Sequence, residues 1–539
     1  MLAGALAAVL AAPAFANPAR ERAYLEARVA ADSGADARAS RQFAQLLAAD
    51  PNSKVIAERA LEHALAAGDY PLALTAARRL DTAGALPPLR RILLAAEALR
   101  TRDWAMAERE AARLEGDQIL ALMAPALRAW RAFGARSGDP AAALAPMENG
   151  PVSGYAVEHR ALLELAAGRG DGGLFLALSP NAGLRPQHLR LIAAAEFQAR
   201  GDRAKALALA AGEQPAMVAA RQMIEAGRPL PGRIDTAAEG FAEFLARVAI
   251  DFQQQNVGRE ALILARLAAY LAPETAQPLM IAAEIADDND PAAAARILAR
   301  VLAGSPFAST ARDLRISLMS RGGESAAAFA EVSERTRRGS RVVRDWVQLG
   351  QLHDDAGRYD EAAAAYARAQ ELAGSSPDPA LPLWSIVLAR AGALDQAGKW
   401  PETRAALREA HRLAPTEPLV LNYLGYAMID RGEAMDESEA MIREAVRLAP
   451  DNAAIVDSLG WALFKRGRVD EAVPLLERAA RAEPADIEIN EHLGDAYYSA
   501  GRRIEARFAW NAALVYAEGA VAERLRGKID RGLPVSAAR

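Results

Sequence analysis

Residues 453–484 of the chain read AAIVDSLGWALFKRGRVDEAVPLLERAARAEP, a pattern typical of two helices joined by a turn at Gly467. Residues 487–518, IEINEHLGDAYYSAGRRIEARFAWNAALVYAE, repeat that pattern. Gly460 in the first stretch recurs 34 residues later as Gly494. A period of this length indicates a stack of helical hairpins, in which each hairpin buries its apolar face against the next.

Three earlier segments carry the same pattern. Residues 418–450 form the nearest copy, with one extra residue in the turn, and residues 384–415 form a weaker one. Residues 343–374, which include DWVQLGQLHDDAGRYDEAAAAYARA, form a strong copy. A proline, which cannot continue the preceding helix, closes three of the units: Pro415, Pro450 and Pro484. Five consecutive matches at about one period exclude a chance pattern.

Small residues recur where the two helices of each hairpin must approach each other most closely. Repeat position eight holds Gly350, Ala391, Gly425, Gly460 and Gly494. Position twenty holds Ala362, Thr403, Ser438, Ala472 and Ala506. Position twenty-seven holds Ala369, Ala410, Ala445, Ala479 and Ala513. Large apolar side chains fill the space beside them: Tyr366, Leu407, Ile442, Leu476 and Trp510. A glycine marks the turn inside each hairpin: Gly357, Gly398, Gly432, Gly467 and Gly501.

This arrangement of residues resembles the tetratricopeptide repeat (TPR) family, clearly over residues 343–518. The resemblance implies an all-α fold, an α-solenoid of antiparallel helix hairpins wound into a TPR superhelix. Composition agrees, because the helix formers Ala, Leu, Arg and Glu dominate and aromatic residues make up only 6%. In such a solenoid each repeat contacts its neighbours and leaves a long concave surface free.

The repeat signature weakens toward the N-terminus, where it is diluted by general alanine richness. We therefore predict a degenerate N-terminal array at residues 17–230 and a TPR array at residues 242–518. A linker at residues 231–241, next to the Gly- and Pro-rich GRPLPG, separates the two. Residues 519–539 are predicted to be a capping helix and tail, because an array needs a polar cap over its last apolar surface.

The overall composition excludes several classes of protein. The chain has 539 residues, too many for one core, and its 64 basic and 69 acidic residues give a formal net charge of -5. That balance does not suggest a nucleic-acid binder. The absence of cysteine excludes disulfides, thiolate metal sites, cysteine nucleophiles and the lipid anchor of bacterial lipoproteins.

The first residues are typical of an export signal. A short apolar run from Leu2 to Ala12 is followed by the small-x-small site Ala14-Phe15-Ala16, without a basic region before it. We predict a signal peptide at residues 1–16; the alternative is an Ala-rich first helix. No later segment reaches the ~20 uninterrupted apolar residues of a membrane span. The mature chain is therefore expected to be soluble and periplasmic, without a transmembrane segment.

The sequence offers little support for catalysis or for a cofactor. The six histidines have no metal-ligand spacing, and neither an HExxH motif nor a Walker loop is present. Residues 150–154, GPVSG, are one residue out of register for a nucleophile elbow. His492 lies near Glu491 and Asp495 on one predicted helix, which fits a polar groove face better than a proton-transfer cluster. We predict no enzyme activity, no metal and no cofactor.

The first helix of each late repeat carries a second stripe of residues, at positions two, five, nine and twelve. In solenoids of the TPR family this stripe lines the concave groove. Here it combines aromatic, polar and acidic residues, a combination typical of peptide-binding grooves. The predicted groove residues are Asn422, Tyr426, Ile429, Asp457, Trp461, Phe464, Glu491, His492, Asp495 and Tyr498. The alternative is that Trp461 and Phe464 only pack adjacent repeats together.

The chain is similar to exported bacterial TPR proteins that act as scaffolds or adaptors at the cell envelope. The resemblance implies a non-enzymatic role in which other proteins or peptides bind in the concave groove. Two alternatives remain open. One is a small-molecule or glycan binder that uses the aromatic groove, and the other is an enzyme whose site lies in the degenerate N-terminal half.

Overall fold

Helices account for all the regular elements of the computed structural model, which describes residues 18–33, 35–117, 120–287, 290–375 and 381–533. The predicted signal peptide at residues 1–16 lies outside the described residues. The chain divides into two compact units, residues 1–328 and residues 329–539, and the division falls inside the helix α18 (Ser325–Arg337). The predicted all-α fold is confirmed.

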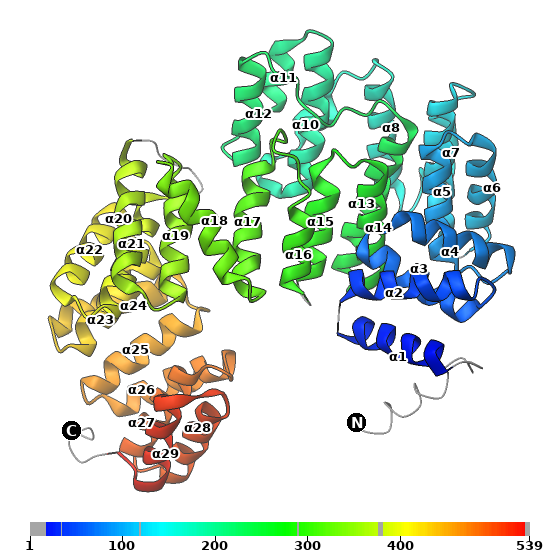
Figure 1. The fold of residues 1–539 in the computed structure, drawn as a ribbon. Coiled ribbons are helices and arrows are strands. Elements are labelled where there is room, and N and C mark those ends of the chain that lie inside the picture. The colour runs from blue at the N-terminus through cyan, green and yellow to red at the C-terminus, as the bar shows by residue number, and fades with distance from the viewer. Residues whose placement is uncertain (1–17, 34, 118–119, 288–289, 376–380, 534–539) are drawn as a thin grey trace. The chain divides into compact units, whose positions relative to one another are not determined.

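The first unit contains short and long helices in sequence (Figure 1). Its first half contains α1 (Pro18–Asp32), α2 (Asp36–Ala49), α3 (Lys54–Ala67), α4 (Tyr70–Thr82), η2 (Pro88–Arg90), α5 (Arg91–Arg100), α6 (Trp104–Glu115), η3 (Leu120–Leu122), α7 (Met123–Ala135), η4 (Ala142–Met147) and α8 (Ser153–Ala166). Its second half contains α9 (Gly173–Ala177), η5 (Pro180–Ala182), α10 (Leu184–Ala199), α11 (Arg203–Leu209), α12 (Pro215–Glu225), α13 (Ala237–Gln254), α14 (Gly258–Leu271), α15 (Ala276–Asp287), α16 (Pro291–Leu298) and α17 (Ala308–Arg321).

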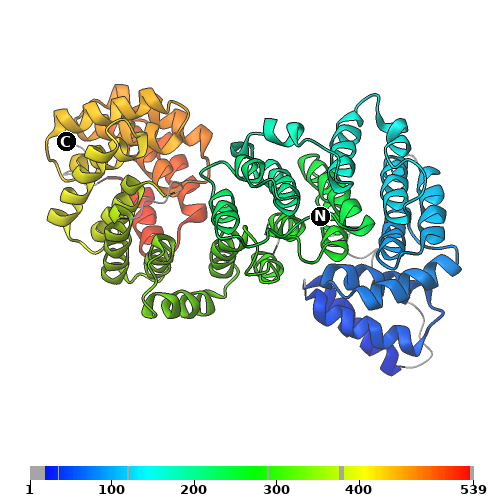
Figure 2. The same cartoon turned by 90° about the horizontal axis from the view of Figure 1, so that it is seen from above.

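The second unit is a succession of antiparallel hairpins that follow a curved path, as the colours from green to red show in Figure 2. The hairpins are α19 (Val343–Asp355) with α20 (Tyr359–Ser375), α21 (Leu383–Gln396) with α22 (Trp400–Leu413), α23 (Pro418–Asp430) with α24 (Met435–Leu448), α25 (Ala453–Lys465) with α26 (Val469–Ala482), and α27 (Ile487–Ser499) with α28 (Arg503–Tyr516). A final helix, α29 (Gly519–Arg531), packs against α28.

The predicted small residues of the second unit lie where the helices of each hairpin meet. A Cβ atom at Gly425 would stand 2.7 Å from Ile442 Cγ1, and one at Gly350 would stand 2.6 Å from Tyr366 Cε1. Both distances are shorter than real Cβ contacts, so a larger side chain would force the helices apart. The residues predicted at positions twenty and twenty-seven are all buried. The repeat register of the solenoid prediction is therefore confirmed in these hairpins.

The five glycines predicted at the hairpin turns all have a left-handed backbone. Their φ angles are 68° at Gly357, 73° at Gly398, 70° at Gly432, 74° at Gly467 and 79° at Gly501. Glycine adopts this conformation without the strain that a Cβ atom brings. These residues let each first helix end and the chain turn back at once into the second.

The first unit departs from a simple stack, because helices far apart in the sequence pack together. α14 contacts α3 and α5, and α13 contacts α5, α7 and α8. The hydroxyl of Tyr70 donates a 2.7 Å hydrogen bond to the carbonyl of Arg266, and the rings of Tyr70 and Tyr270 stack with centroids 4.2 Å apart. The chain therefore folds back on itself in this unit, whereas an ideal solenoid joins only neighbouring repeats.

A buried ionic cluster joins α8, α10, α13 and α15 in the same unit. Arg185 of α10 forms ion pairs with Glu243 of α13 and with Glu158 of α8. It also donates a 2.7 Å hydrogen bond to Oε1 of Gln277, which lies in α15. Nε2 of His188 lies 2.9 Å from Oε1 of Glu243. Burial raises the pKa of Glu243, but the charges of His188 and Arg185 outweigh it and hold that pKa at about 2. Each buried charge therefore has a partner, as burial requires.

The compact units and the predicted arrays have different limits. The predicted linker at residues 231–241 lies inside the first unit, where it leads into α13. The compact units, each held together by its own internal contacts, are separated between residues 328 and 329. The limits predicted from the sequence mark where the repeat signature changes. The predicted domain limits, 17–230, 231–241, 242–518 and 519–539, therefore remain a prediction about repeat families.

Candidate functional site

A pocket of about 580 Å³ opens on the second unit where α23, α25, α27 and α29 meet. The first three are the first helices of successive hairpins, which is where the groove is predicted. Of the ten predicted groove residues, five line the pocket: Tyr426, Trp461, Glu491, His492 and Asp495. The other lining residues are Asp430, Ile487, Glu488, Val521, Arg524 and Lys528.

Aromatic rings from two adjacent repeats stack beside this pocket. The imidazole of His492 lies 3.9 Å from the ring of Trp461 at an angle of 13°, and Phe464 lies 5.0 Å from it at 18°. Trp461 and Phe464 are half-buried. The indole Nε1 of Trp461 is buried and has no hydrogen-bond partner in the described part of the chain. The stack therefore holds Trp461 in place and leaves one donor unused.

The stack rests on a buried pair that links the same two repeats. Nδ1 of His492 lies 2.8 Å from Oδ2 of Asp457, and both residues are buried. Burial lowers the pKa of His492, but the carboxylate of Asp457 outweighs it, so the net pKa is raised. Burial also raises the pKa of Asp457, and His492 offsets that increase only in part. The interaction favours a protonated imidazole, which fixes the orientation of the ring on Trp461.

Two basic side chains of α29 neutralise two acids of α27 at one side of the pocket. Arg524 donates to both oxygens of Glu491, at 2.9 and 2.8 Å, and Lys528 lies 2.6 Å from Oε1 of Glu491. Lys528 also donates to both oxygens of Asp495, at 2.8 and 2.7 Å. Burial raises the pKa of Glu491, but these two bases outweigh it and hold that pKa at about 2. The last helix thus covers the groove face of α27.

Two exposed carboxylates, those of Asp430 and Glu488, also line the pocket, and Glu488 is the more exposed of the two. The hydroxyl of Tyr426 donates a 2.7 Å hydrogen bond to Oε1 of Glu488, which links the first and third hairpins of the pocket. The pKa of Tyr426 is raised, mainly by burial and to a smaller extent by its hydrogen bond to Glu488. The side chain of Glu488 is 66% exposed and lies 3.9 Å from Nε2 of His492. It is the acid most open to a bound group.

The remaining predicted groove residues do not line the pocket. Ile429 is fully buried in the core beside Leu459, so its placement in the groove was wrong: it packs hairpins together and offers no surface. Asp457 lies beneath His492, and Phe464 supports Trp461. Tyr498 packs against Trp510, with ring centroids 5.6 Å apart. Asn422 is half-buried, and its Oδ1 has no hydrogen-bond partner among the described residues.

Sequence reasoning missed Glu488, Arg524 and Lys528. Glu488 occupies position two of the stripe, so the repeat register could have identified it. Arg524 and Lys528 follow Glu491 and Asp495 by 33 residues each, which places a basic pair one period after an acidic pair. This spacing could have indicated that α29 contacts α27 as the first helix of a further repeat would, although α29 lacks the small residues of the repeat.

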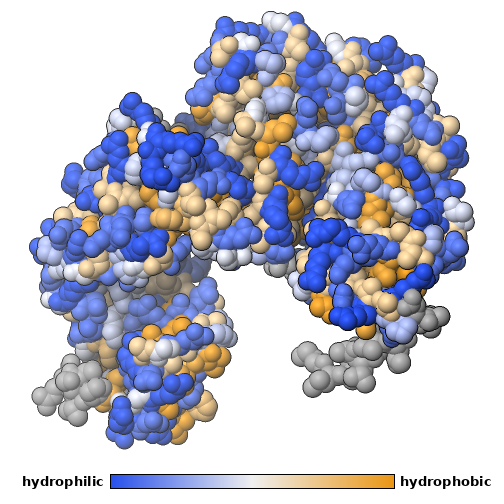
Figure 3. Space-filling view, in the orientation of Figure 1, coloured by the Kyte–Doolittle hydropathy of each residue, from blue (hydrophilic) through white to orange (hydrophobic). Residues whose placement is uncertain are grey.

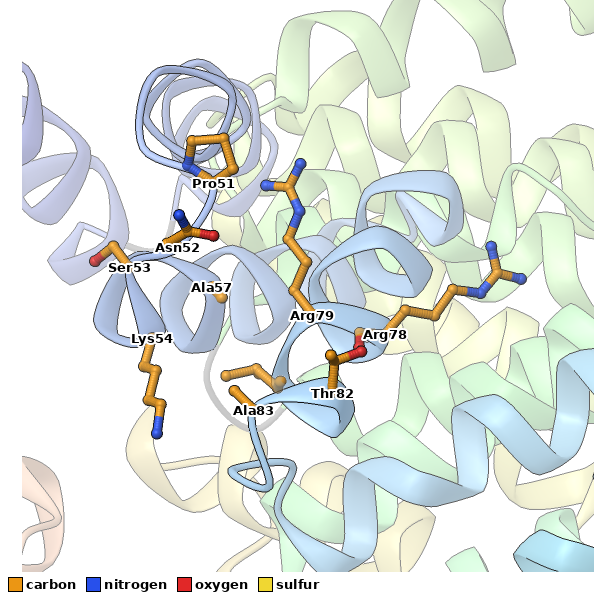
Figure 4. A pocket seen from close by; sticks show the side chains of 10 residues that line it. Pro51, Asn52, Ser53, Lys54, Ala57, Arg78, Arg79, Thr82 and Ala83 are labelled. Atoms are coloured by element: carbon orange, nitrogen blue, oxygen red, sulfur yellow. The ribbon is translucent and has the colours of Figure 1, made fainter.

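A second pocket, of about 330 Å³, lies between α3 and α4 of the first unit. Its charged side chains do not converge: Figure 4 shows Arg79 and Lys54 extending to opposite sides. Arg79 donates 3.0 Å to the carbonyl of Leu47, and Arg78 lies 4.0 Å from Glu97. The charged groups of this pocket cannot contact one ligand together, so the pocket of the second unit is the better candidate.

Metal sites and membrane-spanning helices are both absent from the described residues. No group of three His, Cys, Asp or Glu side chains there is placed to hold a metal ion. No described helix combines the length and the apolar character that a membrane crossing requires.

Comparison with known proteins adds a family match to this geometry. The Tetratricopeptide repeat family model matches residues 346–376, which cover α19 and α20. No curated protein sequence matches the chain. The APC/C hetero-tetramer Cut9-Hcn1 is similar in structure, with 16% identity over 96% of this chain and 97% of that chain and a TM-score of 0.38.

Two further solved structures are similar to the chain. Yeast Tom70 has 14% identity over 95% of both chains, with a TM-score of 0.31. YrrB, described as a TPR protein with an unusual peptide-binding site, has 15% identity over 36% of this chain and 97% of that chain, with a TM-score of 0.27. TM-scores this low do not establish that whole chains superpose.

Five hairpins of the second unit carry the small residues of the repeat at their close approaches, and the first of them matches the family model. The same hairpins show the period, the turn glycines and the buried alanines of that repeat. The chain therefore contains a tetratricopeptide repeat at residues 346–376, and the four hairpins that follow share its pattern of small residues.

Proposed function

We propose that the chain is a non-enzymatic scaffold or adaptor that binds an extended segment of a partner protein in the pocket of the second unit. The observation that carries this proposal is the composition of the pocket wall. Its side chains come from the first helices of three successive hairpins, so the recognition surface follows the repeat and suits an elongated ligand. Half-buried aromatic rings with a few polar groups are typical of the central contacts of protein interfaces.

Unused hydrogen-bonding atoms beside the pocket support a peptide ligand. Oδ1 of Asn422 and Oδ1 of Asp457 are acceptors, Nε1 of Trp461 is a donor, and all three are buried without a partner among the described residues. Leaving such groups unsatisfied costs about 1–3 kcal/mol each. The amide N–H and C=O groups of an extended peptide offer the complementary donors and acceptors. A rotation of the half-buried Asn422 side chain, of the kind common on binding, would bring its Oδ1 to the surface.

A small molecule or a glycan is the second candidate, because about 580 Å³ falls within the usual range of ligand pockets. A sugar would stack on an open aromatic face. Phe464 and His492 already stack on Trp461, so less of its face is left for that contact. The edge of the indole and the exposed Glu488 suit a peptide better.

Site-specific photo-crosslinking tests the proposed groove. Tyr426 is replaced by p-benzoylphenylalanine, which places the reactive group in the pocket. Phe508, an exposed residue of α28 that does not line the pocket, is the control position. We expect crosslinks from position 426 to one short segment of a partner protein in envelope extracts, and their loss when Trp461→Ala is added. Equal crosslinking from position 508, or crosslinks that persist with Trp461→Ala, would contradict the proposal.

We also propose that the protein acts in the periplasm, on the basis of the apolar run and the Ala-x-Ala site before Asn17. N-terminal sequencing of the protein from the envelope fraction should give Asn17 as the first residue. Recovery of the protein only from the cytosol, with Met1 retained, would contradict export.

A further inference from the structure

The first unit contains a pocket of about 800 Å³ with an unusual charge. It is formed by the turn after α5, the ends of α7 and α8, and the start of α13. Four arginines line it, against one carboxylate, that of Asp235: Arg100, Arg102, Arg136 and Arg169. The chain as a whole has a formal net charge of -5, so this concentration of positive charge is a local feature.

Three of these guanidinium groups have no carboxylate partner in the part of the chain that the structure describes. Arg100 is the exception, because its Nε donates a 2.9 Å hydrogen bond to Glu97. Its guanidinium also lies over the ring of Tyr270, 5.1 Å from the centroid. Within the described residues, Arg102, Arg136 and Arg169 are exposed and form no ion pair. Asp235 is itself paired with Arg233 at 3.1 Å. The pocket therefore carries positive charge that no group of its own neutralises.

Two of the unpaired arginines occupy backbone positions that favour glycine. Among the described residues, four that are not glycine have a positive φ, and two of them line this pocket: Arg102 at 59° and Arg136 at 51°. Arg102 occupies the turn of its hairpin, where the hairpins of the second unit carry a glycine such as Gly357 at 68°. A side chain in this conformation costs about 1–2 kcal/mol. Strain of this kind is concentrated at functional sites.

The pocket floor adds apolar contacts and a favourable dipole. Trp104, Phe133 and Leu271 contribute to its lining. The helix α13, 18 residues long, begins there at Ala237 after the capping residue Thr236, and the first turn of a helix carries partial positive charge. The start of the helix adds partial positive charge to that of the arginines.

We propose that this pocket binds a ligand that bears several carboxylate or phosphate groups. A guanidinium presents its donors in a planar fork that matches the two oxygens of such groups, and the resulting bonds are stronger than neutral ones. Arginines on three separate turns address several anionic groups at once, and a pocket of this size has room for them. The site belongs to the first unit and is independent of the peptide pocket of the second.

Isothermal titration calorimetry of the full chain tests this proposal with two probes, tripolyphosphate and a peptide of six aspartates. The decisive variant is Arg102→Gly with Arg136→Gly. It removes two guanidinium groups and also relieves the backbone strain, so the melting temperature should stay the same or rise. We expect the affinity for at least one probe to fall about ten-fold or more for each guanidinium removed.

Matched variants separate a specific site from general charge. Arg41→Gln removes one exposed positive charge from α2, outside the pocket, and should leave both affinities unchanged. Arg169→Gln removes a pocket guanidinium whose backbone is not left-handed, and should weaken binding even if the glycine variant folds poorly. The probe that binds more tightly identifies the source as phosphates or acidic side chains. Failure of both probes to bind, or equal losses with Arg41→Gln and Arg169→Gln, would overturn the proposal.

Discussion

At Gly460 the two helices of a hairpin come so close that no other side chain fits between them. A Cβ atom there would stand 2.7 Å from Leu476 Cγ, so Gly460→Leu must push α25 and α26 apart. Overpacking of this kind costs about 1–3 kcal/mol, shared with neighbouring repeats. We expect a lower unfolding midpoint in thermal and urea unfolding. Gly392→Ala is the control, because a Cβ there meets only ordinary contacts and glycine is unfavourable inside a helix.

His159 makes the first unit sensitive to mild acid. It is fully buried, and its Nδ1 accepts a 3.1 Å hydrogen bond from Nε1 of Trp130, so the ring is neutral with its proton on Nε2. Burial lowers its pKa to about 4. The unfolded chain binds a proton at this residue below pH ~6.5, whereas the folded chain does so only near pH 4. Stability is therefore present above pH ~6.5 and is lost as the pH falls toward 4, by up to about 3 kcal/mol.

Urea unfolding at pH 7 and pH 4.5 measures this loss. Burial also raises the pKa of the acids Asp457 and Asp495, so the informative comparison is with His159→Gln, which cannot gain a proton and can still accept a hydrogen bond from Trp130. The wild-type chain should lose more stability than this variant between the two pH values. Equal losses would show that His159 does not control the acid response.

At the scale of the element, α28 combines a buried and an exposed apolar face. Trp510 is fully buried beside Gly494 and donates 2.9 Å to Oδ1 of Asp495, whereas Phe508, two positions earlier, is 72% exposed. Figure 3 shows hydrophobic residues, in orange, at the surface of this C-terminal end. Other large apolar residues of α28 are exposed as well: Ile504, Val515 and Tyr516.

The two aromatic residues of α28 should respond very differently to truncation. Trp510→Ala leaves a large cavity and removes one of the hydrogen bonds to Asp495, and we expect a loss of about 3–5 kcal/mol in unfolding free energy. Phe508→Ala removes little buried area, so a change within about 0.5 kcal/mol is expected. Chemical unfolding of both variants gives the comparison. Similar losses in the two variants would mean that α28 packs through a different face.

The hairpins of residues 343–518 were predictable because each close approach of helices demands a small residue at one repeat position. The first unit was less predictable, since alanine occurs there on every helix face and the contrast between small and large residues is lost. Nothing in the sequence pairs Tyr70 with Arg266, because that contact depends on α14 folding back.

The candidate site was predictable in part, for a related reason. Helix period places Trp461 and His492 on one side of the hairpins, and both line the pocket. Period alone does not tell how deep a side chain lies. Ile429 shares that side but is buried by the next hairpin, and the charge of Glu491 is neutralised by α29, outside the repeat.

At the scale of the whole molecule, each compact unit has its own buried interactions, so each should unfold as its own cooperative transition. We expect two transitions in scanning calorimetry. In the first unit, Glu243→Gln removes the carboxylate that partners Arg185 and His188, and breaking a buried ion pair costs about 3–5 kcal/mol. In the second unit, Gly460→Leu disturbs the contact between α25 and α26.

Each substitution should lower one transition and leave the other in place. The reason is that a change in the core of one unit alters the unfolding free energy of the other only if the two units unfold together. Glu243→Gln thus assigns one peak to the first unit, Gly460→Leu assigns the other to the second, and the double variant should show both shifts added. A single peak that moves by the full amount with either substitution would mean that the chain unfolds as one unit. The anion pocket and the peptide pocket would then be joined in one cooperative structure, and loss of stability at either would weaken binding at both.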